Sequence, residues 1–293
     1  MSEPIYLITG ATGATGGAAA RELRKQGRRV RGLVHKDDAR AEALRTLGVE
    51  TIVGDLLDLD SIHRAMEGVA GAYFVYPIPE GGLIDAAAFT AQAAIEAGVQ
   101  SLVNMSQKSA RREARSHAAR DHWVSERVFD WSGVPTTHIR PTFFAEWLLY
   151  PRPGWQVENG FIRFPLGRGR HAPIAADDQG RVIAGVLTNP APHAGKTYPL
   201  FGPVELDHYQ IAEKLSTTLD RPFRYEPLSI PQFVTEMQGA GLSPRLIQHI
   251  ASVAQDYQDG IFAGTNDVVE MITGKRPLTL EEFVERNRAK FAV

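Results

Sequence analysis

The chain has 293 residues, of which 43% are hydrophobic, enough for one large or two small domains with a sizeable core. Its formal net charge of −2 provides no field for nucleic acid and no polybasic patch for a membrane surface. The absence of cysteine excludes disulfides, thiolate nucleophiles and cysteine metal sites. No stretch approaches the roughly 20 apolar residues of a membrane span, and the first strand follows Met1 without a signal peptide, so we expect a soluble cytoplasmic protein.

Three glycines near the N-terminus lie between a strand-forming run, residues 5–9, and a helix-like segment, residues 16–26. Glycine permits a tight turn and a close approach of backbone to phosphate, and the N-terminus of the next helix attracts the phosphates. The strand before and the helix after make this pattern a strong indication of a pyrophosphate site; the alternative is a glycine-rich turn that binds nothing. The cofactor-binding residues expected here are Gly10, Thr12, Gly13, Ala14, Thr15 and Gly16.

The first half of the chain alternates apolar strand-like runs with helix-like segments. The strands are expected at residues 5–9, 29–34, 50–53, 71–76, 101–105 and 136–140. The helices are expected at residues 16–26, 39–47, 60–67, with Asp60 as N-cap, 85–97 and 117–131. Repeated β-α-β units require a parallel sheet with helices on both faces.

The second half is less regular, and residues 143–164 are rich in aromatic residues, proline and glycine. Helices are expected at residues 177–188, 207–219, 229–238, 244–257 and 279–291, and a strand at 196–201. Capping patterns begin at Asp207, Ser229 and Thr279. We therefore predict an α/β fold: a Rossmann-type doubly wound parallel sheet in residues 1–153, and a smaller, mainly helical substrate lobe in residues 154–293. The strand near 196–201 would return to the sheet.

Five segments of the first half together resemble the NmrA-like group of atypical short-chain dehydrogenase/reductases. They are TGATGATGG (9–17), VRGLV (30–34), GVETIVGDLLD (48–58), the ExxxxxSGVP segment (126–135) and IRPTFFAE (139–146). The resemblance implies a Rossmann domain, bound NAD(P) and a variable C-terminal substrate lobe, and a homodimer is an expectation from the family. The group includes NAD(P)H-dependent reductases of quinones and of azo and triphenylmethane dyes, and also nucleotide-sensing regulators with no known reaction.

The tip of the second strand selects between NAD and NADP. An acidic side chain there holds the ribose 2′-OH of NAD, whereas a basic one favours the 2′-phosphate of NADP. His35 and Lys36 come first at this tip, so we predict NADP, with Lys36 as the main phosphate contact. The alternative is that Asp37 reaches back to the ribose of NAD.

Further cofactor contacts are expected at the ends of the later strands. By resemblance, Asp55 and Leu56 lie near the adenine, and Tyr76 and Pro77 lie along the nicotinamide ribose. Met105, at the end of the fifth strand, is assigned to the same site. For Leu56 and Tyr76 ordinary packing is an equal alternative.

The usual catalytic pair of the wider family, Tyr-x-x-x-Lys, is missing. Counting back from Glu126, which matches the family's glutamate, places Ala118 at the tyrosine position and His122 at the lysine position. Reduction of a simple ketone requires protonation of an alkoxide, so the loss of this donor argues against an alcohol/ketone dehydrogenase. A conjugated acceptor such as a quinone delocalises the charge, and positioning alone can then carry much of the catalysis.

His122 and Ser106 are the candidate catalytic residues. His122 precedes Glu126 by four residues on a predicted helix, so the carboxylate could orient the imidazole and favour its charged form; the alternative is an ordinary surface pair. Ser106 ends the fifth strand, where a role as cap of the following loop is the alternative. The basic residues of that loop, Lys108, Arg111, Arg112 and Arg115, are expected to be solvated.

Aromatic residues after the sixth strand suggest a wall for a flat apolar substrate. The candidates are Phe143, Phe144, Trp147 and Tyr150, with core packing as the alternative. The scattered histidines give no metal-site pattern. The expected function is reduction of a quinone-like acceptor by NADPH. The alternatives are a regulator that senses NADP(H) and acts through a protein partner, and a non-redox isomerase or lyase.

Overall fold

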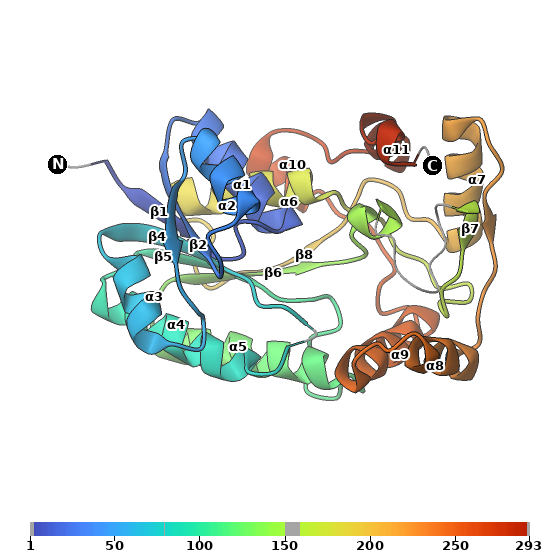
Figure 1. The fold of residues 1–293 in the computed structure, drawn as a ribbon, viewed down its shortest axis with the longest axis horizontal. Helices are drawn as coiled ribbons and strands as arrows, with labels where there is room; N and C mark the ends of the chain where they lie inside the picture. Colours follow the sequence, from blue (N-terminus) through green and yellow to red (C-terminus); the bar gives the residue numbers. More distant parts are fainter. Residues whose placement is uncertain (1–2, 79, 150–158, 292–293) are drawn as a thin grey trace.

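A computed structural model describes residues 3–78, 80–149 and 159–291 (Figure 1). Its central sheet has seven strands in the order β3-β2-β1-β4-β5-β6-β8, and every neighbouring pair is parallel. The strands are β1 (Ile5–Ile8), β2 (Arg29–Val34), β3 (Glu50–Val53), β4 (Val69–Phe74), β5 (Ser101–Met105), β6 (Thr136–Pro141) and β8 (Thr197–Leu200). The order reverses between β1 and β4, and ligands of open parallel sheets bind at such a switch point.

Helices cover both faces of this sheet, because successive side chains of each strand point to opposite faces and both sets are apolar. Tyr6 and Ile8 of β1 pack in one buried cluster, while Ile5 and Leu7 pack in another. One face is covered by α1 (Ala14–Lys25), α2 (Ala39–Thr46), α6 (Ala176–Thr188) and α10 (Val268–Thr273). The other is covered by α3 (Leu59–Met66), α4 (Leu83–Glu96) and α5 (His117–Ser132) (Figure 1). The predicted fold class is confirmed.

The remaining elements form a C-terminal lobe with its own buried apolar cluster. They are β7 (Phe161–Ile162), β9 (Arg224–Tyr225), α7 (His208–Leu219), α8 (Ile230–Gly239), α9 (Pro244–Gln258), α11 (Leu280–Arg286) and α12 (Arg288–Phe291). A short 3₁₀ helix, η1 (Ala145–Leu149), leads from the sheet toward this lobe. The sequence analysis did not predict β7, β9, η1 or α10.

Most helix boundaries differ from the prediction by one or two residues, and two of the differences have an identifiable cause. Asp58, rather than Asp60, is the N-cap of α3, and its side chain accepts hydrogen bonds from the backbone N–H groups of Asp60 and Ser61. The single helix expected over residues 279–291 is interrupted at Asn287 and continues as α12. The predicted capping boxes at Ser229 and Thr279 are present.

Part of the second half of the chain belongs to the sheet layer rather than to the lobe. Strand β8 pairs with β6 at the edge of the sheet. Helix α6 packs so closely on α1 that a Cβ on Gly180 would lie 2.6 Å from the carbonyl carbon of Ala18. The expected boundary between residues 153 and 154 lies outside the described residues.

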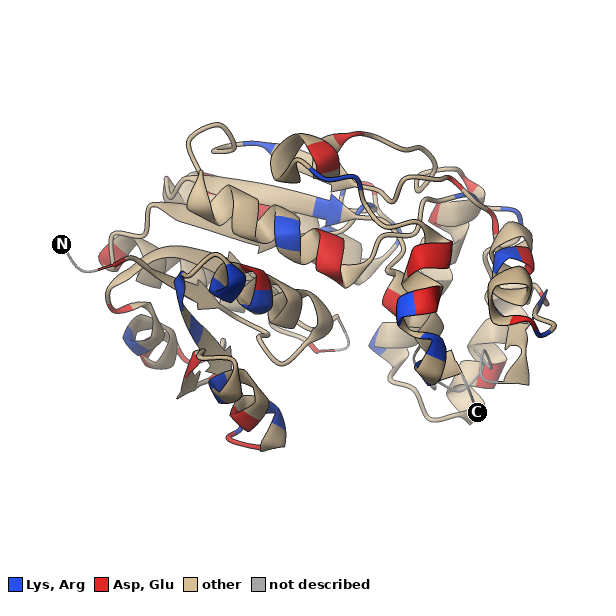
Figure 2. Ribbon diagram, turned by 90° about the horizontal axis from the view of Figure 1, so that it is seen from above, with Lys and Arg blue, Asp and Glu red and all other residues tan. Residues whose placement is uncertain are grey.

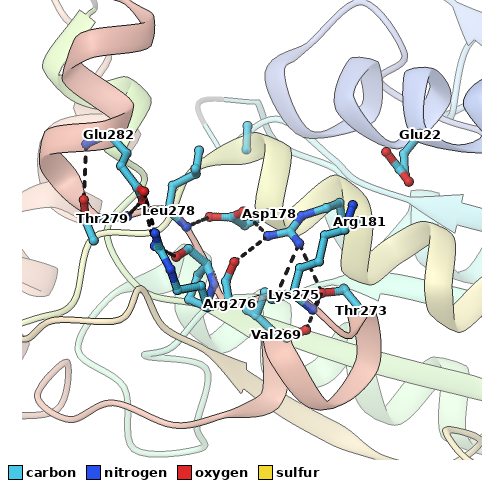
Figure 3. A network of polar contacts seen from close by, with 12 residues as sticks. Glu22, Asp178, Arg181, Val269, Thr273, Lys275, Arg276, Leu278, Thr279 and Glu282 are labelled. Atoms are coloured by element: carbon cyan, nitrogen blue, oxygen red, sulfur yellow. Dashed lines mark hydrogen bonds and ion pairs between the residues drawn. The ribbon is translucent and has the colours of Figure 1, made fainter.

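A buried carboxylate connects α6 to the segment that leads into α11. Asp178 accepts a hydrogen bond of 2.8 Å from the backbone N–H of Leu278 and pairs with Arg181 at 2.5 Å (Figure 3). Arg181 also donates to the backbone carbonyl groups of Lys275 and Arg276. Elsewhere the helices carry both basic and acidic residues (Figure 2). No helix in the described part of the chain is long and apolar enough to cross a membrane.

A second buried carboxylate gives a testable prediction about stability. Glu126 has no exposed side-chain surface, and Arg140 of β6 binds its two oxygens at 2.7 and 2.5 Å. Replacing Arg140 by Met leaves a buried charge without its main partner, and we expect unfolding by urea to show a loss of about 3–5 kcal/mol. The partly exposed Arg127 side chain contacts Glu126 at a distance of 3.5 Å. Arg127→Met should therefore lower the free energy of unfolding by no more than about 1 kcal/mol. Equal losses in the two variants would contradict this account of Glu126.

Candidate functional site

Two glycines of the turn after β1 occupy positions that leave no room for a side chain. Gly10 has a φ of +57°, and the N–H of Gly13 donates to its carbonyl oxygen at 2.9 Å. A Cβ on Gly16 would lie 2.3 Å from that same carbonyl oxygen. These two positions therefore require glycine, since a left-handed φ and such a close backbone contact both disfavour other residues.

This turn fits the pyrophosphate of a dinucleotide. Helix α1 begins at Ala14, its N-cap is Gly13 without a capping side chain, and its first turn carries no acidic residue. The first N–H groups of such a helix have no intrahelical acceptor and lie at the positive end of its dipole. An anion bound there would satisfy them.

At the tip of β2 the acidic side chains already have partners. Asp37 pairs with Arg45 at 2.8 Å, and Asp38 caps α2 and pairs with Arg40 at 2.6 Å. His35 and Lys36 are exposed, and neither has an ion pair within the described residues. The arrangement leaves two basic side chains available to a phosphate.

The other expected cofactor contacts have structural roles in the protein itself. The Asp55 carboxylate accepts from the N–H of Leu57 at 2.9 Å, and Leu56 packs against the apolar cluster below the sheet. The Tyr76 hydroxyl donates to the carbonyl of Gly81 at 2.7 Å, while Pro77 is exposed. Their contacts with a nucleotide stay predictions.

A cavity of about 280 Å³ lies where β4, β5 and β6 end, and α9 forms its opposite wall. The residues lining it that were predicted for the site are Thr15, Tyr76, Met105, Ser106, His122, Phe144 and Trp147. Those missed by the sequence analysis include Leu246, His249, Ile250, Val253 and Tyr257 of α9, with Phe262 beyond it. The cavity thus joins the first turn of α1 to a largely apolar chamber. The sequence analysis predicted a helix over residues 244–257 but not that this helix lines the cavity.

The predicted substrate residues separate into two environments. Phe144 and Trp147 line the cavity. Phe143 does not: it is 1% exposed and packs on Phe164, His171 and His208 in the core of the C-terminal lobe. The structure therefore gives Phe143 a packing role in place of the predicted substrate contact. Tyr150 lies outside the described residues.

His122 is not paired with Glu126, and this part of the prediction is wrong. Both oxygens of Glu126 are bound by Arg140. His122 is buried against the cavity, and burial, with His249 and Arg245 nearby, lowers its pKa to about 3. The imidazole is therefore neutral at pH 7, the opposite of the expected charged form. Ala118, at the tyrosine position, is buried as well.

Ser106 lies at the cavity with its hydroxyl buried and without a hydrogen-bond partner in the described structure. The loop that follows is not a solvated charge run throughout. Arg111 binds the fully buried Asp256 of α9 through two hydrogen bonds of 2.9 and 2.6 Å, and Arg115 pairs with Asp259 at 2.8 Å. These arginines hold α9 against the sheet domain. No group of three or more potential metal ligands occurs among the residues described.

Fold and glycine turn together define an α/β protein of the Rossmann type. The model of the NmrA-like family matches residues 3–284, and the chain belongs to this family. An NAD(P)H azoreductase from Xenophilus azovorans is 30% identical over 288 residues, which cover 98% of this chain and 99% of that protein.

Solved structures show the same fold. The NADPH-dependent quinone oxidoreductase of Escherichia coli, crystallised with NADPH, superposes with a TM-score of 0.84 at 24% identity, over 96% of this chain and 99% of that one. NmrA, a negative transcriptional regulator crystallised with NAD, has a TM-score of 0.78 at 17% identity, over 96% of this chain and 94% of that one.

Substitution of Gly16 tests the assignment of the glycine turn. Gly16→Ala places a methyl group against the Gly10 carbonyl and displaces the first N–H groups of α1, so dinucleotide affinity should fall at least about tenfold. Gly239→Ala is a matched control, because a Cβ there meets nothing within 4 Å. Titration by nicotinamide fluorescence, with a thermal melt of each variant, separates lost binding from lost folding. Unchanged affinity in Gly16→Ala would place the nucleotide elsewhere.

Proposed function

We propose that this protein is an NADPH-dependent reductase that transfers a hydride to a flat, conjugated, apolar acceptor. The observation that carries the proposal is the continuity of the cavity. It begins at Thr15, in the first turn of α1, passes Met105 at the end of β5, and ends among the apolar residues of α9. A nucleotide held at the glycine turn would therefore have its reactive end beside an apolar chamber.

The choice of NADPH rests on the tip of β2. Arg45 and Arg40 engage the two acidic side chains, whereas His35 and Lys36 stay available. A ribose 2′-phosphate would meet basic side chains there, while a free 2′-OH would find no uncommitted carboxylate. The NADPH bound to the related Escherichia coli structure supports this choice.

The chemistry follows from what the cavity lacks. The bound cofactor would supply the hydride, but Ala118 and neutral His122 replace the tyrosine and lysine that would assist protonation of an alkoxide. Phe144 and Trp147 can hold an aromatic acceptor flat, and the apolar walls exclude water. Hydride transfer to such an acceptor depends chiefly on alignment of the two rings. The azoreductase activity named for the Xenophilus azovorans relative agrees with an acceptor of this class.

The direct test is to titrate the protein with NADPH and with NADH and then to add quinones and azo dyes. We expect tight binding of NADPH and steady oxidation that depends on the acceptor, followed as loss of nicotinamide absorbance. Tight binding without oxidation by any acceptor would favour the second candidate, a nucleotide-sensing regulator, which the likeness to NmrA supports. Binding of neither nucleotide would contradict both functions.

Lys36 should set the nucleotide preference. Lys36→Ala removes one charge-assisted contact with the 2′-phosphate, so affinity for NADPH should fall about tenfold while affinity for NADH stays within about twofold. Lys25→Ala is the matched control, because Lys25 lies in the last turn of α1, at the end of that helix opposite the glycine turn. Equal losses for the two nucleotides in Lys36→Ala would show that Lys36 does not contact the phosphate.

A further inference from the structure

His249 presents a defined ring nitrogen to the cavity. Its Nδ1 lies 2.8 Å from the hydroxyl oxygen of Ser116, and that oxygen already accepts a hydrogen bond from the N–H of Ala119 at 3.1 Å. The hydroxyl hydrogen of Ser116 is then free to be donated to Nδ1. A neutral imidazole carries one N–H, and in the tautomer in which Ser116 donates to Nδ1 that proton is on Nε2. Burial and nearby Arg245 lower the pKa of His249 to about 4, which keeps the ring neutral at pH 7.

His122 reaches the same tautomer by another route. Its Nδ1 is buried and has no hydrogen-bond partner in the described structure. A buried N–H without an acceptor is rarer and less favourable than a buried lone pair, so the proton of this ring belongs on Nε2 as well. The ring lines the cavity from α5, facing the wall that α9 contributes.

Ser106 and Gln107 also carry buried donors at this cavity that have no hydrogen-bond partner in the described structure, whereas Tyr76 and the nearby Arg245 are already paired. The Tyr76 hydroxyl is committed to the Gly81 carbonyl, and the Arg245 guanidinium is paired with Asp121. The walls around the two imidazoles come from Leu246, Ile250 and Val253. In such surroundings a hydrogen bond to an ionised oxygen is stronger than in water.

We propose that His122 and His249 donate Nε2–H hydrogen bonds to the oxygen of the acceptor, and that the acceptor is therefore a conjugated carbonyl compound, such as a quinone or an enone. This inference rests on the proposed reductase function. The acceptor gains a hydride at the carbon conjugated to its carbonyl, and the π electrons shift to form an enolate or phenolate. NADPH is the reductant and becomes NADP⁺, and solvent water then supplies the proton. The two imidazoles stabilise the oxyanion and transfer no proton themselves.

A pair of substitutions at His249 separates hydrogen bonding to the acceptor from packing. The side-chain amide of Gln reaches the place of Nε2, whereas that of Asn reaches only the place of Nδ1 beside Ser116. We expect His249→Asn and His122→Asn each to lower kcat/KM for a quinone at least tenfold, which is a loss of about 1.4 kcal/mol of transition-state stabilisation. We expect His249→Gln to keep kcat/KM within about threefold of the unaltered protein. A cationic triphenylmethane dye accepts hydride without forming an oxyanion, so its kcat/KM should stay within about threefold in all three variants. His63→Asn is the control that should change neither value, because the His63 side chain is exposed on α3.

Binding of 4-nitrophenol to the protein with NADP⁺ gives a readout that needs no turnover. The phenolate absorbs separately from the phenol, so a pH series yields the ratio of their affinities. We expect His249→Asn to lower the phenolate-to-phenol ratio at least fivefold, and His249→Gln to keep it. An unchanged ratio in His249→Asn, no phenolate binding to the unaltered protein, or equal kinetic losses with quinone and dye would overturn the proposal. If the protein binds phenolate in preference to phenol but does not oxidise NADPH with any acceptor tested, the two-imidazole site is supported and the reductase function is contradicted.

Discussion

The buried carboxylate of Asp256 fixes the geometry on which the candidate site depends. A charge that has left water is tolerated only with close partners, and Arg111, from the loop after β5, supplies two hydrogen bonds to it. Asp256 belongs to α9, so this pair fixes the wall of the cavity relative to the ends of the strands. Gln248 of the same helix adds two bonds to the backbone, one from the N–H of His117 and one to the carbonyl of Arg115. The two halves of the cavity are therefore held by directional polar contacts, which specify a position more narrowly than apolar packing does.

Most of the sheet could be predicted because each strand is short, apolar and bounded by turn residues. The bounds expected for β2, β3 and β5 are those observed. The errors occur where two residues compete for one role or where the signal is too short. Asp58 and Asp60 are both acceptable caps, and only the backbone conformation of Asp58, extended before a helical turn, decides between them. Strands of two residues such as β7 carry no periodicity to detect.

The site was predictable to the extent that it follows from strand ends. Met105, Ser106 and Phe144 follow parallel strands, whose carboxyl ends meet at one edge of the sheet. The pairing of His122 with Glu126 failed because helical spacing takes no account of the neighbouring strand, and Arg140 of β6 binds both oxygens of Glu126. His249 was missed for a related reason: nothing in the local sequence of α9 says that this helix closes the cavity, and the contact depends on a tertiary ion pair.

In the proposed function, binding of the nucleotide and reduction of an acceptor depend on separate parts of this chain. The glycine turn and the tip of β2 lie within the sheet domain, and neither is formed by α9. His122 of α5 and His249 of α9 line one cavity because α9 is held against the sheet domain. A family member could therefore lose the second arrangement and keep the first, which would leave a protein that binds the nucleotide without reducing anything. This chain has both arrangements. His122 and His249 are buried where charging them would be costly. Uncharged donors in an apolar chamber can stabilise the oxyanion of an acceptor that delocalises its negative charge. They cannot protonate an alkoxide, so they do not suit an acceptor whose reduction requires that step. In the proposed function, the burial that keeps His122 and His249 neutral thus also narrows the range of acceptors.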